Sequence, residues 1–149
     1  MFPTLTEDLL EQVNNIDNKA STNVTKLGRC FKFDFKKNKF VTVDGKLVEI
    51  TDDTEKVEQW ILLLLATRKD KYNVYKNTDF YVNIDDLIGG KLNAYKKAEL
   101  EREITEGIEK HRYVKSVEDF NIEQIKNKVI VKLTVKLIDD SELEVSTSV

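Results

Sequence analysis

The stretch that decides the fold is the C-terminal segment VIVKLTVKLIDDSELEVSTSV, residues 129–149. Its first half alternates apolar and polar residues with a period of two, which is typical of a half-buried strand. A turn is expected at residues 139–141, and a second alternation follows it. The pattern predicts a terminal β-hairpin, whose open edges either this chain or another chain has to cover. Its apolar residues are Val129, Val131, Leu133, Val135 and Leu137 in the first strand and Leu143 and Val145 in the second.

Residues 29–50, RCFKFDFKKNKFVTVDGKLVEI, show a second set of short alternating segments. A lysine-rich turn separates the first two segments, and Asp44-Gly45 is a hairpin turn signal before the third. We expect a β-meander of two strands with a short third strand at residues 47–50. Two alternatives stay open at this point: the meander covers the terminal hairpin, or it leaves the hairpin edge free. The apolar residues that alternate here are Phe31, Phe33, Phe35, Phe40, Val41 and Val43.

Two helices are predicted between the meander and the hairpin. The first follows Asp52, which has Glu55 at capping spacing, and its second half is apolar nearly all round, so it should be the most buried helix. The second runs from about residue 93 to residue 111. Between them we expect an irregular aromatic segment, a helical turn at residues 84–88 and a stop at Gly89-Gly90. The residues predicted to share one core are Trp60, Leu64, Leu100, Ile104 and Ile108.

The two ends of the central region complete the predicted organisation. Val114, Val117 and Phe120 are expected to lead through a polar connection to the hairpin. At the N-terminus, apolar residues at helical spacing predict a short helix with Thr4 and Glu7 as a capping box, followed by a polar linker. We therefore expect residues 1–26 to be an N-terminal helix and linker, and residues 27–149 to be one α+β domain with no parallel sheet.

Composition excludes several classes of partner. The chain has 149 residues, 40% of them hydrophobic and 34% charged, which suits one soluble domain with a real core. A formal charge of -3 with interspersed signs predicts neither nucleic-acid binding nor a basic membrane contact. The longest apolar run, residues 60–66, is far shorter than the ~20 residues that cross a bilayer. Cys30 is the only cysteine, which suits a reducing compartment, and the N-terminus does not resemble a secretory signal.

The sequence offers little catalytic equipment. His111 and Cys30 are each the only residue of their kind, so a transition-metal site is not expected. We expect His111 to interact with a helix dipole, and Cys30 to be a packing residue. Gly89-Gly90 lacks the lysine and serine or threonine of a P-loop, and the many carboxylates fall on polar faces. We predict a protein that is not an enzyme and that needs no cofactor or metal.

An aromatic and cationic segment is the main candidate for a partner contact. Clusters of this kind are enriched at the anchors of protein interfaces, although core packing explains them equally well. The open edge of the terminal hairpin is the second candidate, since β-augmentation uses such edges for main-chain recognition. The candidate anchors are Arg68, Lys69, Tyr72 and Tyr75, with Phe80 and Tyr81 nearby.

The order of these motifs resembles the small baseplate-wedge proteins of contractile phage tails, also called sheath initiators and historically labelled lysozyme-like. The matching motifs are FKFDF, VDG, VEQWILLLLATRKDKYNVY, IDDLIGG, ELEREITEGI and the VKSVEDF strand before a final hairpin. Their order is most similar to the PBSX-type prophage and R-type tailocin branch, over residues 29–144. That branch usually has Thr-Glu-Arg where this chain has Thr67-Arg68-Lys69, so a charge pair of the family is not carried over.

The resemblance implies a structural role in the baseplate of a contractile phage tail or tailocin. Initiators of this family join wedge proteins to the first sheath ring and offer a hairpin to sheath strands, so the expected partners are sheath protein, wedge proteins and proteins near the tube or hub. Six copies would assemble in the bacterial cytoplasm and remain in the mature particle. The alternatives are a peptidoglycan hydrolase, which needs a carboxylic acid of raised pKa facing a second carboxylate, and a stand-alone adaptor that binds extended peptides.

Overall fold

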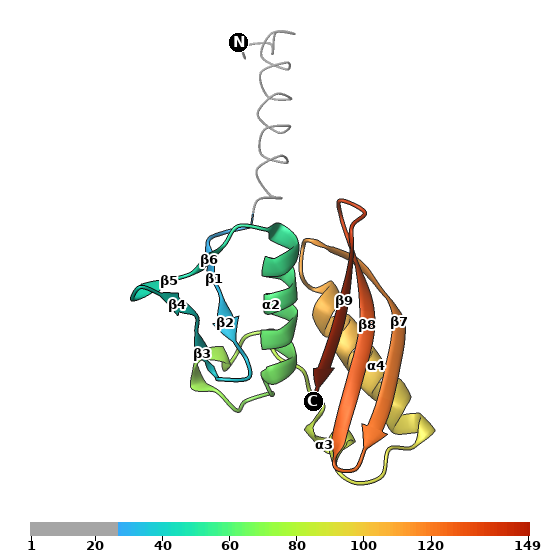
Figure 1. The fold of residues 1–149 in the computed structure, drawn as a ribbon. Helices are drawn as coiled ribbons and strands as arrows, with labels where there is room; N and C mark the ends of the chain where they lie inside the picture. The colour runs from blue at the N-terminus through green and yellow to red at the C-terminus, as the bar shows by residue number, and fades with distance from the viewer. Residues whose placement is uncertain (1–26) are drawn as a thin grey trace, which may run out of the picture.

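The computed structural model describes residues 27–149, and the predicted N-terminal helix lies outside these residues (Figure 1). Short strands come first, helices follow, and three long strands end the chain, which confirms the α+β class. The elements are β1 (Cys30–Phe31), β2 (Phe33–Asp34), β3 (Lys39–Phe40), β4 (Thr42–Val43), β5 (Lys46–Leu47), β6 (Glu49–Ile50), α2 (Asp53–Ala66), a 3-10 turn (Asn73–Tyr75), α3 (Asp85–Ile88), α4 (Ala94–Glu109), β7 (Val114–Ile125), β8 (Lys128–Leu137) and β9 (Glu142–Ser148).

The terminal sheet is antiparallel, with strand order β7-β8-β9. The predicted hairpin is confirmed as β8 and β9, which pair without interruption and place Leu133 opposite Val145. The VKSVEDF strand implied by the resemblance is confirmed as the first part of β7. The expectation of a polar connection between that segment and the hairpin is wrong, because β7 continues to Ile125 and pairs with the other side of β8. Two register shifts interrupt β7, the second around Asp119, whose φ is 50°. Such bulges break the period of two that marks a strand in a sequence.

The core lies between one face of this sheet and the two long helices. Figure 1 shows α4 crossing behind the sheet, with α2 beside β9. Of the five residues predicted to share the core, four are buried and Trp60 packs against them partly buried. The buried helical side chains are Val57, Ile61, Leu64 and Leu65 on α2 and Leu100, Ile104 and Ile108 on α4. Alternate side chains of β8 and β9 complete the same cluster.

Both long helices begin at a capping side chain, of which the sequence predicted the one at Asp52. The Asp52 carboxylate accepts hydrogen bonds from the amides of Thr54 and Glu55, both at 3.4 Å. The Asn93 side chain accepts from the amide of Lys96 at 2.8 Å. These bonds satisfy amides of the first turn, which have no partner inside the helix.

The meander closes on itself. The amide of Lys32 donates to the carbonyl of Val48 at 2.8 Å, Val48 donates to Val41 at 3.1 Å, and Val41 donates to Lys32 at 2.9 Å. Its three segments therefore form a ring of hydrogen bonds, and among the described residues they pair only with one another. The meander does not pair with the terminal hairpin, so the alternative in which it covers the hairpin edge by strand pairing is wrong.

Candidate partner-binding surfaces

The predicted strand residues line the inside of the terminal sheet. β8 is the central strand, so both of its edges are paired within the chain. The predicted apolar side chains are therefore buried in the core, and within residues 27–149 only the outer strands β7 and β9 of this sheet have an unpaired backbone edge. The side chains concerned, none of them more than 8% exposed, are Val129, Val131, Leu133, Val135 and Leu137 on β8 and Leu143 and Val145 on β9.

The outer edge of β9 carries a regular row of free main-chain groups. At its two ends, the Val149 amide donates to Val129, and the Ser141 carbonyl accepts from Leu137, both at 2.9 Å. Since an antiparallel ladder alternates, the odd-numbered residues of β9 bond to β8 and the even-numbered ones point outward. No hydrogen bond within residues 27–149 joins that edge to another segment. The outward residues, all exposed, are Glu142, Glu144, Ser146 and Ser148.

The two outer strands differ in regularity. β9 has seven consecutive pairs with β8, whereas bulges interrupt β7. Bulges on an outer strand twist its edge away from a flat template and disfavour pairing with another chain. The two edges of the sheet thus differ, and β9 is the more regular of the two.

Arg68, a predicted partner contact, is used inside the fold. Its guanidinium lies 2.9 Å from the Asp85 carboxylate and also donates to the carbonyl of Leu65. Only 14% of its side chain is exposed. The Nζ atom of Lys69 lies 5.7 Å from the ring centre of Tyr81, a cation–π contact. Arg68 therefore holds the end of α2 to the start of α3 and is occupied by that contact.

The predicted aromatic anchors fall into two groups. Tyr75 packs on Phe80, with ring centres 5.0 Å apart, and Phe80 packs on Trp60 at 5.6 Å. Tyr72 is 45% exposed, and its neighbour Val74 is 82% exposed. The large apolar side chains that this segment exposes are therefore Tyr72 and Val74. Sequence reasoning missed Val74 because a single valine among polar residues gives no periodic signal.

His111 is a neutral packing residue. Its Nδ1 accepts a hydrogen bond from the amide of Tyr113 at 3.1 Å, and its ring lies 4.5 Å from that of Trp60. Burial first, and the nearby Arg112 charge second, hold the pKa of His111 below its ordinary value. The expectation that His111 interacts as a cation with a helix dipole is wrong, because Nδ1 is used as an acceptor.

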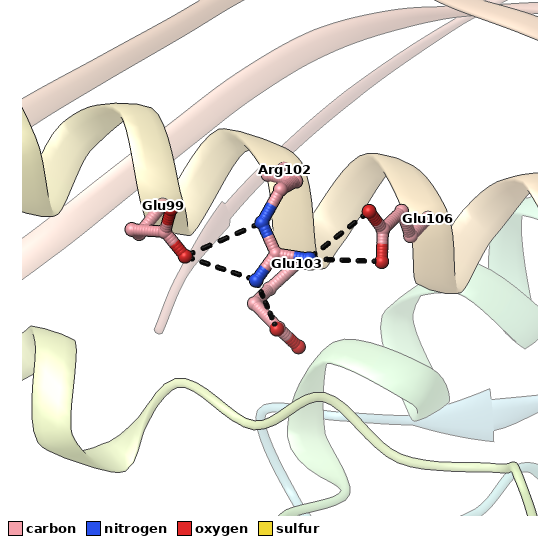
Figure 2. A network of polar contacts seen from close by, with 4 residues as sticks. All are labelled: Glu99, Arg102, Glu103 and Glu106. Carbon is pink, nitrogen blue, oxygen red and sulfur yellow. Dashed lines mark hydrogen bonds and ion pairs between the residues drawn. The ribbon is translucent and has the colours of Figure 1, made fainter.

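Charged residues on α4 form a solvated network around one arginine (Figure 2). Arg102 contacts Glu99 and Glu103 at 2.9 Å each and Glu106 at 3.0 Å. Hydrogen bonds to Glu99 and Glu106, and the charges of both, hold the pKa of Arg102 above its usual value. One guanidinium thus stabilises three carboxylates on the helix surface.

Four carboxyl groups among residues 27–149 have a pKa that clearly departs from its ordinary value. The resolved pKa shifts of Asp34, Glu49, Glu118 and Asp139 are all downward, with hydrogen bonding as the largest cause. A glycosidase acid needs a pKa that is raised. Residues 27–149 contain no cluster of three metal-ligating side chains. No helix among them is long and apolar enough to span a bilayer.

A mixed domain with a closed meander and one regular open sheet edge suits assembly with other chains. The family model of the contractile injection system sheath initiators matches residues 29–140. The chain belongs to this family, which agrees with the resemblance of its motifs. It is therefore a structural component of a contractile injection system, associated with sheath and baseplate. No curated protein matches the chain.

Proposed function

We propose that this chain starts the sheath by accepting a sheath strand along the outer edge of β9. The observation that carries the proposal is the uninterrupted ladder of β8 and β9, which leaves the amides and carbonyls of four exposed residues pointing outward. Strand addition at such an edge gives affinity through main-chain hydrogen bonds. Because β8 is buried and paired on both edges, a pull on the added strand is transmitted into the core of the domain.

In the same proposal, the baseplate contact lies in the segment that follows the C-terminal end of α2. Tyr72 and Val74 lie in the segment that follows this helix, and both are exposed. The segment is held to the body by the Arg68–Asp85 ion pair and by the packing of Tyr75 on Phe80. An exposed aromatic on a braced loop supplies contact area at low entropic cost, so we assign Tyr72 and Val74 to the wedge protein. By resemblance, six copies would link wedges to sheath in particles assembled in the bacterial cytoplasm.

The strand proposal is tested by a proline that removes one outward amide. Ser146→Pro deletes a donor at the open edge and leaves the ladder with β8 intact, whereas Val145→Pro would break that ladder. We expect Ser146→Pro to fold, to join the baseplate and to abolish sheath formation when it is produced with the sheath protein of the same particle. Ser146→Ala, which keeps the amide, should support normal sheaths in electron micrographs. Normal sheath assembly by folded Ser146→Pro would overturn the proposal.

A second proline variant keeps the proposal testable if Ser146→Pro does not fold. Ser148→Pro removes the last outward amide of β9, next to the end of the chain, where strain costs least. We expect it to reduce sheath formation while its circular dichroism and thermal unfolding match those of the wild type. Wild-type sheath formation by both folded proline variants would exclude β9 as the receiving edge.

The baseplate contact is tested with a matched pair of exposed tyrosines. Tyr72→Ala should weaken capture of the wedge protein, while Tyr95→Ala on α4, which removes a tyrosine that is 70% exposed, should leave capture unchanged. Binding of purified wedge protein by each variant is the measurement. Equal capture by Tyr72→Ala and wild type would move the wedge contact elsewhere.

A further inference from the structure

The outer face of the terminal sheet carries a repeated order of charges. In one row, Glu118 on β7 contacts Lys136 on β8 at 2.9 Å, and Lys136 lies opposite Glu142 on β9. Glu118 is the largest cause of the raised pKa of Lys136, and Glu142 adds to it. The charges across the sheet thus read acid, base, acid.

A second set of charges, further along the strands, has the same order. Asp119 on β7, Lys132 on β8 and Glu144 on β9 line one shallow hollow on this face, together with Thr134 and Ser146. Thr134 is the direct partner of Glu144, and Ser146 that of Lys132, so the lysine and Glu144 are diagonal neighbours. Both sets of charges end on β9 with a carboxylate.

The two terminal carboxylates lack a partner on their outer side. Glu142 and Glu144 are exposed, and neither makes an ion pair within the part of the chain that the structure describes. They are also two of the four residues whose main-chain groups point outward from β9. A strand added to β9 would place a side chain directly opposite each of them, on the same face and with Cβ atoms about 5 Å away.

Resting on the strand addition proposed for β9, we infer that this edge selects an incoming strand with Lys or Arg at two alternate positions. These residues face Glu142 and Glu144 and extend both sets to acid, base, acid, base. The positions opposite Ser146 and Ser148 take small hydroxyl or other neutral residues. The intervening residues of the incoming strand are apolar, because they continue the face on which Leu143 and Val145 are buried. Acidic residues opposite the two glutamates are rejected, since like charges in direct pairs destabilise a sheet.

Two peptides test the charge selection on the full-length protein. Both are nine residues long, fluorescently labelled and alternate valine with threonine, and two alternate threonines are replaced by lysines in one and by glutamates in the other. At physiological salt, the lysine peptide should bind about 2- to 30-fold more tightly than the glutamate peptide. In the double variant Glu142→Lys, Glu144→Lys the preference should reverse. The variant Glu101→Lys, Glu109→Lys changes the net charge equally on α4 and should keep the wild-type preference.

The peptide experiment tests the charge selection, and a different experiment tests the strand proposal on which it rests. Equal affinity for the two peptides, no binding of the lysine peptide, or a preference lost equally in the α4 variant overturns the charge selection. The strand proposal is judged separately, by sheath formation with Ser146→Pro. A folded Glu142→Lys, Glu144→Lys protein should also give fewer sheaths than the α4 variant. Unchanged sheath yield from that protein, with Ser146→Pro inactive, would leave β9 as the receiving edge and discard its charge preference.

Discussion

The side-chain oxygen of Gln59 lies 2.7 Å from the amide nitrogen of Phe33, and its side-chain nitrogen lies 2.8 Å from the carbonyl oxygen of Phe31. These two main-chain groups point away from the ring of hydrogen bonds that closes the meander. The Gln59 side chain on α2 therefore satisfies two main-chain hydrogen-bonding groups of the meander, as a neighbouring strand would. It also fixes the meander to the most buried helix.

Gln59→Ala should loosen the meander from α2. Both main-chain groups lose their partner in a partly buried site, which should lower the free energy of unfolding by about 1–3 kcal/mol. Urea denaturation measures the loss, and hydrogen exchange of the Phe33 amide should accelerate. Glu58→Ala, one position earlier on the same helix, should change the free energy by less than about 0.5 kcal/mol. Equal effects of the two substitutions would contradict this role of Gln59.

Leu64→Ala should be among the most damaging single changes in the core. Leu64 is 1% exposed and lies between the sheet and α4, so truncation leaves a cavity and should cost about 2–5 kcal/mol. Leu63→Ala is a close control, because that side chain is 38% exposed. Chemical denaturation of both variants gives the comparison. A Leu64→Ala protein no less stable than Leu63→Ala would mean that the core is not packed around α2.

Arg68→Met should release the segment between α2 and α3. Because Asp85 is 66% exposed, solvent weakens the ion pair, and the expected loss of stability is only about 1 kcal/mol. The sharper readout is limited proteolysis, which should cut residues 69–84 faster than in the wild type. Lys69→Met removes a neighbouring cation that has no such ion pair and should be cut at the wild-type rate. Identical cleavage of the two variants would count against a bracing role for Arg68.

His111 should make stability fall as the pH drops below neutrality. Its folded pKa is lower than the ordinary 6.5, so the unfolded chain binds more protons once the pH is below about 6.5. Stability is then lost progressively until the pH reaches the folded pKa. His111→Phe, which keeps a ring against Trp60, should show a flatter free energy of unfolding between pH 7 and pH 5. The same slope in both proteins would show that another group titrates in this window.

Much of the fold could be predicted from local patterns in the sequence. The cap at Asp52, the helical stripe that holds Leu64 and the alternation of β8 were legible because each depends on residues close together in the chain. Of strand β7, only residues 114–120 were indicated, through the VKSVEDF motif of the resemblance, because a bulge at Asp119 breaks the alternation of the whole strand. Closure of the meander was also hidden, since it depends on hydrogen bonds between segments that no local pattern links.

The candidate sites were predictable only in part. Alternation identifies strands but does not give their order in a sheet, so the sequence could not show that β8 is central and β9 outermost. The side chains of Val131 and Leu133 were therefore named, although both are buried, whereas the main chain of Ser146 points outward from the sheet. Arg68 looked available because its partner, Asp85, is distant in the chain. Tyr72 kept its place on the surface, since nothing in the described fold covers it.

The bulges of β7 leave the sheet with a single regular edge, the outer edge of β9. With one irregular side and one regular side, the sheet can be extended by a single strand at β9, and insertion between two other strands is disfavoured. If two free copies paired through β9 in a register that sets Glu142 of one opposite Glu144 of the other, like charges would face each other in direct pairs and disfavour that contact. Edge-to-edge stacking of identical subunits in that register is thereby disfavoured.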